Sequence, residues 1–373
     1  MPKGMRLLLA AGGTGGHLFP GIAVAEAAQR EAGAEVLFVG TASGMEKDVV
    51  PRLGFALRLI PAEQLRGRSW WGRLHALWAA LRGLRAAWQV VREFTPDLIF
   101  SIGGYASGPT VLAGWVRRVP CVLLEPNTIP GLTNRLLGRL ATRICVGFPG
   151  TTRFFPAHKV ICTGNPLRWS AGGPQARPPA QSAAFTVLIF GGSAGAHRLN
   201  QTLPKALALL GADREKLRVI HQTGQADHAE VSATYTKLGV HAEVVPFIDT
   251  MQEAYAAADL VVCRAGAITV AELTALGKPA ILIPYPYAAD DHQRANAEVL
   301  VQARAARLVL DTEFTPERMS QEIRALMTNR PRLEAMARAA TALGRPDATS
   351  AVVRECLACL PSADRLDSEV LCR

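Results

Sequence analysis

The sequence predicts an α/β protein with two Rossmann-like, parallel-sheet domains that face a cleft. Short apolar runs alternate with helical patterns through both halves of the chain, as in doubly wound folds. A glycine-rich segment follows an apolar run twice, at residues 12–17 and again at residues 191–197. The length of 373 residues also exceeds the size at which one hydrophobic core keeps growing. Two similar domains follow from these observations.

Buried strands are expected wherever a short run is apolar and often β-branched, because strands covered on both faces lack polar alternation. These runs are residues 7–11, 36–39, 57–60, 98–102, 122–124 and 143–146, then 186–190, 218–222, 242–245, 260–263, 280–284 and 306–310. We therefore expect domains at 1–164 and 165–340, with a Gly, Pro and Ala-rich linker over about 165–184 and a terminal segment at 341–373. Ligands should bind beyond the carboxyl ends of the strands.

Residues 12–17, Gly-Gly-Thr-Gly-Gly-His, form the turn between the first strand and a helical pattern starting near Pro20. Glycines tolerate positive φ and let a ligand approach backbone N–H groups, so an anion or a sugar is the expected ligand. A dinucleotide fingerprint is excluded because Leu18 stands where a third small residue should pack, and a P-loop is excluded because its lysine is missing. A tight turn without a ligand is the alternative.

The charge balance favours a negatively charged partner. The formal net charge is +10 and the pI is near 9.6, which suits nucleic acid, anionic lipid or a phosphorylated substrate. We expect neither a secretory signal nor a membrane-spanning helix, since no uncharged apolar run reaches about 18 residues. Seven scattered cysteines fit a reducing compartment, and Cys356 with Cys359 suits a pair of buried thiols better than half of a zinc site.

Polar side chains follow two further strands of the first domain. Gly103-Gly104-Tyr105-Ala106-Ser107 comes after residues 98–102, and Glu125-Pro126-Asn127 comes after residues 122–124. With His17, these loops should meet at one edge of the sheet. An imidazole and a carboxylate there are candidates for proton transfer, although each residue could equally serve as a helix cap or a loop hydrogen bond.

An aromatic and basic stretch lies at residues 64–91. Its apolar members are Trp70, Trp71, Leu74, Trp78 and Leu81, and the arginines around them include Arg73, Arg82 and Arg85. One interpretation is a patch that binds the headgroup layer of an anionic membrane, because tryptophan favours that interface. The other is an ordinary amphipathic helix facing the core. No aromatic-interleaved strand supports a nucleic-acid groove.

The second half contains the most specific pattern. Residues 259–263 read as a strand and Ala267 opens a helix, so the amides of Ala267, Ile268 and Thr269 suit a diphosphate. Glu272, one turn later, can accept hydrogen bonds from a ribose diol, or it only complements the helix dipole. No D-x-D pair occurs, so a metal-bridged nucleotide-sugar site is not expected.

Eight segments occur in the order found in one known family. They read GGTGGHLFPGIAVAE, GGYASGP, LLEPNTIPGLTNRLL, GNPLR, FGGSAGAHRLN, PFIDTM, VVCRAGAITVAEL and DDHQRANA. Through them the chain resembles the MurG family of bacterial transferases, which move N-acetylglucosamine from UDP-GlcNAc onto undecaprenyl-diphosphate-linked N-acetylmuramoyl-pentapeptide in peptidoglycan synthesis. The resemblance implies a GT-B fold, an acceptor- and membrane-binding first domain, a donor-binding second domain and a last helix that returns to the first. It also implies a peripheral protein on the cytoplasmic face of the membrane.

The resemblance also implies which residues bind substrate. For UDP-GlcNAc they are Thr14, Gly15, Gly16, Asn127, Arg168, Ser193, Ile248, Ala267, Ile268, Thr269, Val270, Ala271, Glu272 and Gln293. For the acceptor they are Gly103, Gly104, Tyr105 and Ser107. Arg168 and the Ile248 backbone would hold uracil. Pro126 replaces a glutamine common in the family, which removes a backbone donor there. No metal or other cofactor is expected.

The hypothesis for the chemistry is a single inverting displacement by the muramoyl 4-hydroxyl. His17 is the first choice for the base, and Glu125 is the second, as base or as the group that orients His17. His197, in the matching loop of the second half, is expected to be structural or close to phosphate. Three alternatives stay open: a glycosyltransferase acting on diacylglycerol or another lipid, a non-catalytic membrane scaffold, and a nucleotide-sugar epimerase.

Overall fold

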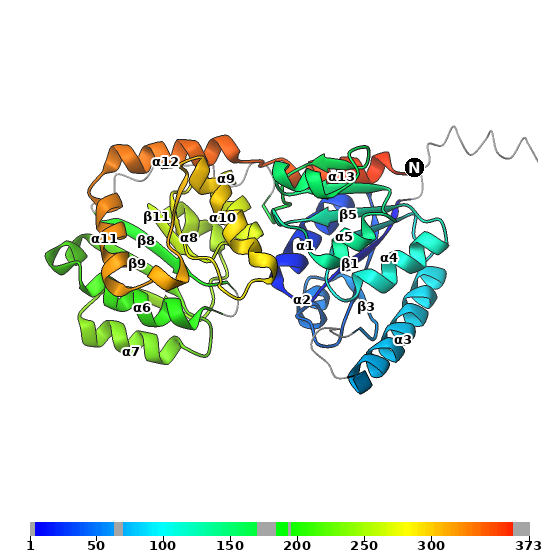
Figure 1. The fold of residues 1–373 in the computed structure, drawn as a ribbon, viewed down its shortest axis with the longest axis horizontal. Coiled ribbons are helices and arrows are strands. Elements are labelled where there is room, and N and C mark those ends of the chain that lie inside the picture. Colours follow the sequence, from blue (N-terminus) through cyan, green and yellow to red (C-terminus); the bar gives the residue numbers. More distant parts are fainter. Residues whose placement is uncertain (1–3, 63–69, 170–183, 193–194, 361–373) are drawn as a thin grey trace, which may run out of the picture. The chain divides into compact units, whose positions relative to one another are not determined.

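The structure is a computed structural model that describes residues 4–62, 70–169, 184–192 and 195–360, without the side chains of residues 70–80. Its residues group into two compact units. The first unit is Met1–Ser170 with Asp347–Arg373, and the second is Ala171–Pro346. Figure 1 labels the elements of both, and each unit is described by itself below.

The first unit is built on a seven-stranded sheet in the order β3-β2-β1-β4-β5-β6-β7, with every neighbouring pair parallel. The strands are β1 Arg6–Ala11, β2 Glu35–Gly40, β3 Ala56–Leu59, β4 Leu98–Gly103, β5 Cys121–Glu125, β6 Arg143–Val146 and β7 Val160–Cys162. The central strands β4 and β5 are buried along their whole length, as their mainly apolar sequence predicts.

Helices cover both faces of this sheet (Figure 1). They are α1 Gly15–Ala32, α2 Glu46–Arg52, α3 Trp70–Phe94, α4 Ser107–Val116, α5 Leu132–Leu137, the 3-10 helix η1 Pro149–Phe154 and α13 Ala348–Ala358. One core cluster joins the sheet to α1 and α13, and another joins it to α3 and α4. The last described helix therefore completes the hydrophobic core of the first unit: Val352, Val353 and Cys356 pack with residues of α1.

The second unit repeats this plan with a six-stranded parallel sheet in the order β10-β9-β8-β11-β12-β13. Its strands are β8 Phe185–Phe190, β9 Leu217–Gln222, β10 Ala242–Val245, β11 Leu260–Cys263, β12 Ala280–Leu282 and β13 Ala306–Leu308. Its helices are α6 His197–Ala208, η2 Gly211–Lys216, α7 His228–Leu238, α8 Met251–Ala257, α9 Ala267–Ala275, η3 Ala289–Asp291, α10 His292–Gln302, η4 Asp311–Glu313, α11 Pro316–Met327 and α12 Arg330–Leu343.

The structure differs from the sequence-based expectation in three places. Helix α1 begins at Gly15, so Pro20 lies inside it, where its missing N–H removes one helical hydrogen bond. Strand β7 was not predicted, because three residues at a sheet edge carry too little pattern. Residues 165–170 group with the first unit, where Leu167 donates its N–H to Thr349 Oγ1 at 3.1 Å and accepts from that hydroxyl at 3.0 Å.

Candidate active site

The first glycine loop, residues 12–16, connects β1 to α1. Gly13 has φ of 98°, a conformation that favours glycine. Thr14 is the N-cap of α1, so His17 lies in the first turn of the helix rather than in the loop where the sequence placed it. Its Nδ1 is 3.2 Å from Thr14 Oγ1. This contact ties the imidazole to the exposed end of the loop.

Not every amide of this loop is available to a ligand. The N–H of Gly13 donates to Oε2 of Glu46 at 2.9 Å. A protein carboxylate thus occupies a position where the glycine pattern predicted an anionic ligand. For the Gly13 amide, the expectation of anion binding is wrong.

A second loop of the first unit, residues 103–107, touches the first one. Gly103 and Gly104 have φ of 103° and 86°, and a Cβ on Gly104 would lie 2.6 Å from the carbonyl oxygen of Gly12. Tyr105 is exposed. Ser107 is fully buried and donates to the carbonyl of Gly103 at 2.6 Å, so it stabilises the loop and is not placed to contact an acceptor as predicted.

Glu125, at the end of β5, is also buried. Its carboxylate accepts from the amide of Asn127 at 2.9 Å, that of Gly131 at 3.1 Å and Nδ2 of Asn134 at 3.0 Å. Burial raises the pKa of this carboxyl, and the bonds from Asn127, Asn134 and Gly131 act in the opposite direction. Glu125 therefore shapes the loop that carries Asn127.

In the second unit, most of the residues predicted to bind the donor lie in α9. Gly266 is its N-cap, and the first amides of a helix have no partner within the helix. Ala267 and Val270 are buried, while Ile268, Thr269 and Ala271 are half-buried. Oε2 of Glu272 accepts a hydrogen bond from the buried Tyr255 hydroxyl at 2.8 Å. Burial raises the pKa of this tyrosine, so it stays a donor and fixes the glutamate.

The segment between β12 and α10 follows α9 in the chain, and the side chains of Gln293 and Arg264 hold its backbone. Oε1 of Gln293, in the first turn of α10, accepts from the amide of Tyr285 at 2.9 Å. Arg264 donates to the carbonyls of Ile283 at 3.2 Å and Pro284 at 2.9 Å. Burial lowers the pKa of this guanidinium, and Asp311, 3.5 Å away, acts in the opposite direction.

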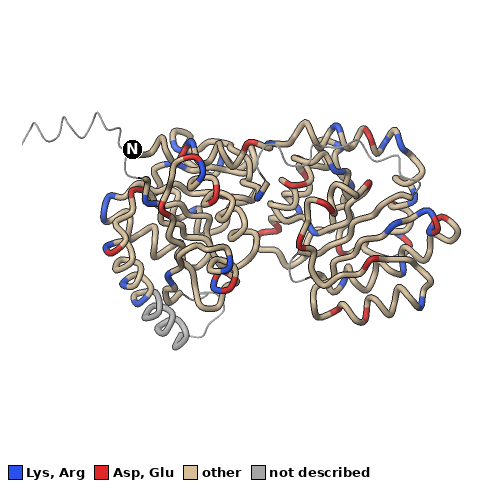
Figure 2. Tube along the Cα trace, turned by 180° about the vertical axis from the view of Figure 1, so that it is seen from behind, with Lys and Arg blue, Asp and Glu red and all other residues tan. Residues whose placement is uncertain are grey.

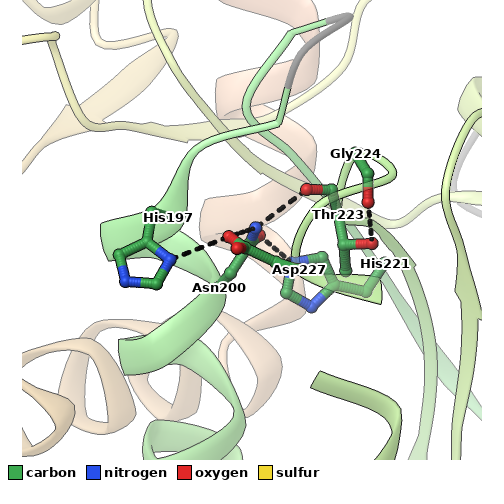
Figure 3. A network of polar contacts seen from close by, with 6 residues as sticks. All are labelled: His197, Asn200, His221, Thr223, Gly224 and Asp227. Carbon is green, nitrogen blue, oxygen red and sulfur yellow. Dashed lines mark hydrogen bonds and ion pairs between the residues drawn. The ribbon is translucent and has the colours of Figure 1, made fainter. Parts of the chain in front are cut away.

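The second glycine loop, residues 191–196, leads into α6 and a polar network (Figure 3). His197 Nδ1 lies 3.0 Å from Asp227 Oδ2. Asn200 donates to the same oxygen at 2.7 Å and to the carbonyl of Thr223 at 2.8 Å. The hydrogen bond from Asn200 is the main cause of a lowered Asp227 pKa. Behind them, His221 Nε2 is 3.1 Å from Asn200 Oδ1, and burial lowers the pKa of this histidine to about 3.

Several other predicted residues have only partly described surroundings. Ser193 lies outside the described residues, as do the side chains of Trp70, Trp71, Arg73, Leu74 and Trp78. Ile248 is half-buried after β10. The Arg168 guanidinium lies over the Phe19 ring, 5.1 Å from its centroid, within the first unit.

Comparisons with known proteins agree with this architecture. The family models described as "Glycosyltransferase family 28 N-terminal domain" and "Glycosyltransferase family 28 C-terminal domain" match residues 7–146 and 186–352. A Geobacter metallireducens "UDP-N-acetylglucosamine--N-acetylmuramyl-(pentapeptide) pyrophosphoryl-undecaprenol N-acetylglucosamine transferase" is 46% identical, covering 94% of this chain and 98% of the relative. A Myxococcus xanthus protein of the same name is 44% identical over 95% of this chain and 92% of its own. The crystal structure of Acinetobacter baumannii MurG has a TM-score of 0.77 and 34% identity, covering 95% of this chain and 99% of that one. The chain belongs to the MurG family.

Membership in the MurG family establishes the GT-B fold of two Rossmann-like units. A UDP-GlcNAc 2-epimerase from Neisseria meningitidis shares that fold with a TM-score of 0.65, covering 94% of this chain and 99% of its own, at 15% identity. Sequence reasoning missed two buried polar residues of this MurG-family site, Asn134 and Arg264. A signal was present for Arg264, which directly follows the buried apolar strand β11, but not for Asn134, which lies between Thr133 and Arg135.

Proposed function

We infer that this chain carries the activity of the MurG family: it transfers N-acetylglucosamine from UDP-GlcNAc to undecaprenyl-diphosphate-linked N-acetylmuramoyl-pentapeptide, which converts lipid I to lipid II in peptidoglycan synthesis. The observation that carries this conclusion is an identity of 46% over 94% of the chain to a relative of that name. The diacylglycerol-dependent alternative has no support among these relatives.

On the donor side, we propose that the second unit binds UDP-GlcNAc. The first amides of α9 suit the diphosphate because they carry the positive end of the helix dipole. Glu272, held by Tyr255, would accept hydrogen bonds from the ribose diol. Gln293 in the first turn of α10 would contact sugar hydroxyls.

On the acceptor side, the proposed chemistry is one displacement with inversion. The muramoyl 4-hydroxyl oxygen forms the new bond to the anomeric carbon while the bond to the UDP oxygen breaks. His17 takes the hydroxyl proton. When Nδ1 of His17 donates to Thr14 Oγ1, 3.2 Å away, Nε2 is unprotonated, and we assign it as the accepting nitrogen. The UDP charge that develops is stabilised by the α9 amides.

The decisive experiment uses two acceptors. Labelled N-acetylglucosamine is offered from UDP-GlcNAc to a short-chain lipid-diphosphate muramoyl-pentapeptide and, in parallel, to diacylglycerol. Product is expected with the first acceptor alone. Product with diacylglycerol alone would contradict the proposed acceptor, and the absence of product with both would contradict the proposed activity.

We further propose that the first unit binds an anionic membrane surface through α3 and α4. Leu81, Trp88 and Trp115 are large apolar side chains that are 57%, 38% and 52% exposed. The Arg117 guanidinium lies over the Trp88 ring, 5.6 Å from its centroid, and Figure 2 shows further basic residues along the described part of α3. In the part of the chain that the structure describes, no helix combines the length and apolarity needed to cross a bilayer. Tryptophan with arginine suits the headgroup layer, here on the cytoplasmic face.

The membrane proposal is tested by sedimentation with vesicles containing phosphatidylglycerol. Removing two basic charges costs about 1 kcal/mol each at an anionic surface, so Arg82→Gln with Arg85→Gln should weaken binding roughly tenfold or more. Lys237→Gln with Arg338→Gln makes the same charge change on exposed residues of the second unit and should leave binding unaffected. Equal loss in both double variants would mean that net charge alone, and not this surface, drives binding.

A further inference from the structure

Glu46 is a buried acid for which the proposed chemistry has no use. It is the first residue of α2, its side chain is 0% exposed, and it lies against the first glycine loop. Burying a carboxylate is unfavourable unless hydrogen bonds compensate the lost hydration. The hydrogen bonds that Glu46 accepts therefore indicate which parts of the backbone it stabilises.

Both oxygens of Glu46 accept a backbone amide. Oε2 accepts from Gly13 at 2.9 Å, and Oε1 accepts from the amide of Thr41 at 2.7 Å. Oε1 also accepts from the Thr41 hydroxyl at 3.1 Å. A carboxylate offers two acceptor oxygens where a carboxamide offers one, so a glutamine here would leave one of the two amides without an acceptor.

The backbone around Glu46 reserves space for its carboxyl group. A Cβ on Gly12, Gly40 or Gly44 would lie 2.4, 2.3 or 2.0 Å from an atom of the Glu46 side chain. Three glycines, one after β1, one at the end of β2 and one before α2, thus make room for one carboxylate. Any side chain at these positions would displace it.

The loop fixed by Glu46 is the one that carries the proposed base. The amide of His17 donates to the carbonyl of Thr14, one residue beyond the anchored Gly13. The carbonyl of Gly12 in turn lies against Gly104 of the Gly103–Tyr105 loop. One buried carboxylate therefore supports both the loop that leads to the proposed base and the loop that we assign to the acceptor.

We propose that Glu46 is a positioning residue for the transfer reaction. Through Gly13 it holds the first glycine loop, with His17, and the adjoining Gly103–Tyr105 loop in the geometry that the acceptor needs. This proposal rests on the proposed function, because it takes these loops to carry acceptor and base. We propose UDP binding for the second unit, so the affinity for UDP should not depend on Glu46.

The test compares Glu46→Gln, Gly44→Ala and Thr41→Val in the full chain. Glu46→Gln preserves the side-chain volume and removes one acceptor oxygen. Gly44→Ala leaves Glu46 in place and pushes its carboxylate, since the new Cβ would meet Oε2. Thr41→Val is the matched control, because it removes only the hydroxyl contact and keeps both amide bonds.

Transfer kinetics with the lipid-diphosphate acceptor distinguish a positioning role of Glu46 from a general loss of the folded structure. Loss of loop geometry on the scale of an ångström lowers kcat on the order of 10- to 100-fold, and we expect this for Glu46→Gln and Gly44→Ala. The calorimetric affinity for UDP should change less than about threefold, as should every constant of Thr41→Val. Combining Glu46→Gln with Gly44→Ala should cost little more than either variant alone.

A second measurement does not depend on turnover. Amide hydrogen exchange at residues 9–17 should be faster in Glu46→Gln than in wild type and unchanged in Thr41→Val. Retained protection of the Gly13 amide, wild-type kcat in Glu46→Gln, or an equal loss of UDP affinity would each overturn the proposal. If His17→Ala turns over normally while Glu46→Gln loses both kcat and protection, the base assignment fails and the positioning role of Glu46 stands.

Discussion

The two glycine loops differ in what holds them, although both join a first strand to a helix. In the first loop the Gly13 amide donates to the buried carboxyl group of Glu46. In the second loop, the neutral carboxamide of Gln222 donates from Nε2 to the carbonyl of Gly192 at 3.1 Å. Next to it, the carboxamide of Asn200 donates to the carbonyl of Thr223, which lies outside the loop. The similar sequence patterns therefore conceal opposite electrostatics.

This difference indicates where a diphosphate can bind. A carboxylate directly against a loop disfavours an anionic ligand there, whereas helix amides without such a neighbour favour one. The first loop therefore suits the hydroxyl and amide groups of the acceptor sugar. The first amides of α9 suit the donor diphosphate that we propose for the second unit, so glycine content alone does not identify a phosphate site.

The largest expected effect comes from exchanging the two loop histidines for alanine, one at a time. His17→Ala should lower kcat on the order of 100-fold or more, because it removes the proton acceptor. His197→Ala should change kcat less than about threefold, since its imidazole is exposed and pairs with Asp227. Steady-state transfer kinetics check both. Similar losses in the two variants would remove the functional distinction between the loops.

A smaller effect is expected at the donor site. Glu272→Gln should raise the KM for UDP-GlcNAc roughly tenfold, since hydrogen bonds to a charged group are worth about 1.5–3 kcal/mol. Tyr255→Phe removes only the hydroxyl that fixes Glu272 and should raise this KM less. Neither variant should alter the KM for the acceptor. A shift confined to the acceptor KM would reverse the assignment of substrates to the two units.

The smallest effect concerns the network behind the second loop. Because burial holds the His221 pKa at about 3 in the folded state, against about 6.5 when unfolded, the folded state binds fewer protons between these values. Stability from this group is complete above pH 6.5 and is lost as pH falls toward 3, by up to about 1.4 kcal/mol per pH unit. His221→Gln should flatten that dependence in urea unfolding followed by circular dichroism.

An internal control accompanies this measurement. All six tryptophans lie between residues 70 and 169, so tryptophan emission follows the first unit alone. Its transition should keep the same pH dependence in His221→Gln. An unchanged slope in the circular dichroism transition of that variant would mean that His221 is not the titrating group.

The sequence predicted the strands well because a short, mainly apolar run is typical of a strand that is buried on both faces. Residues 98–102 in β4 are an example. It predicted the site less well where function depends on buried contacts between distant segments. Nothing in the local pattern shows that Glu46 reaches Gly13, or that Ser107 turns inward toward the carbonyl of Gly103. Such contacts arise from tertiary packing, which a local pattern does not encode.

The return of α13 to the first unit makes the second unit a contiguous insertion, between Ser170 and Asp347. The apolar face of α1 that receives Val352, Val353 and Cys356 is therefore covered only after some 170 intervening residues have been synthesised. During translation the inserted unit can fold while its host still lacks a core helix. Completion of the core of the first unit thus waits for α13, and early termination would expose apolar surface on a protein whose other half can already be formed.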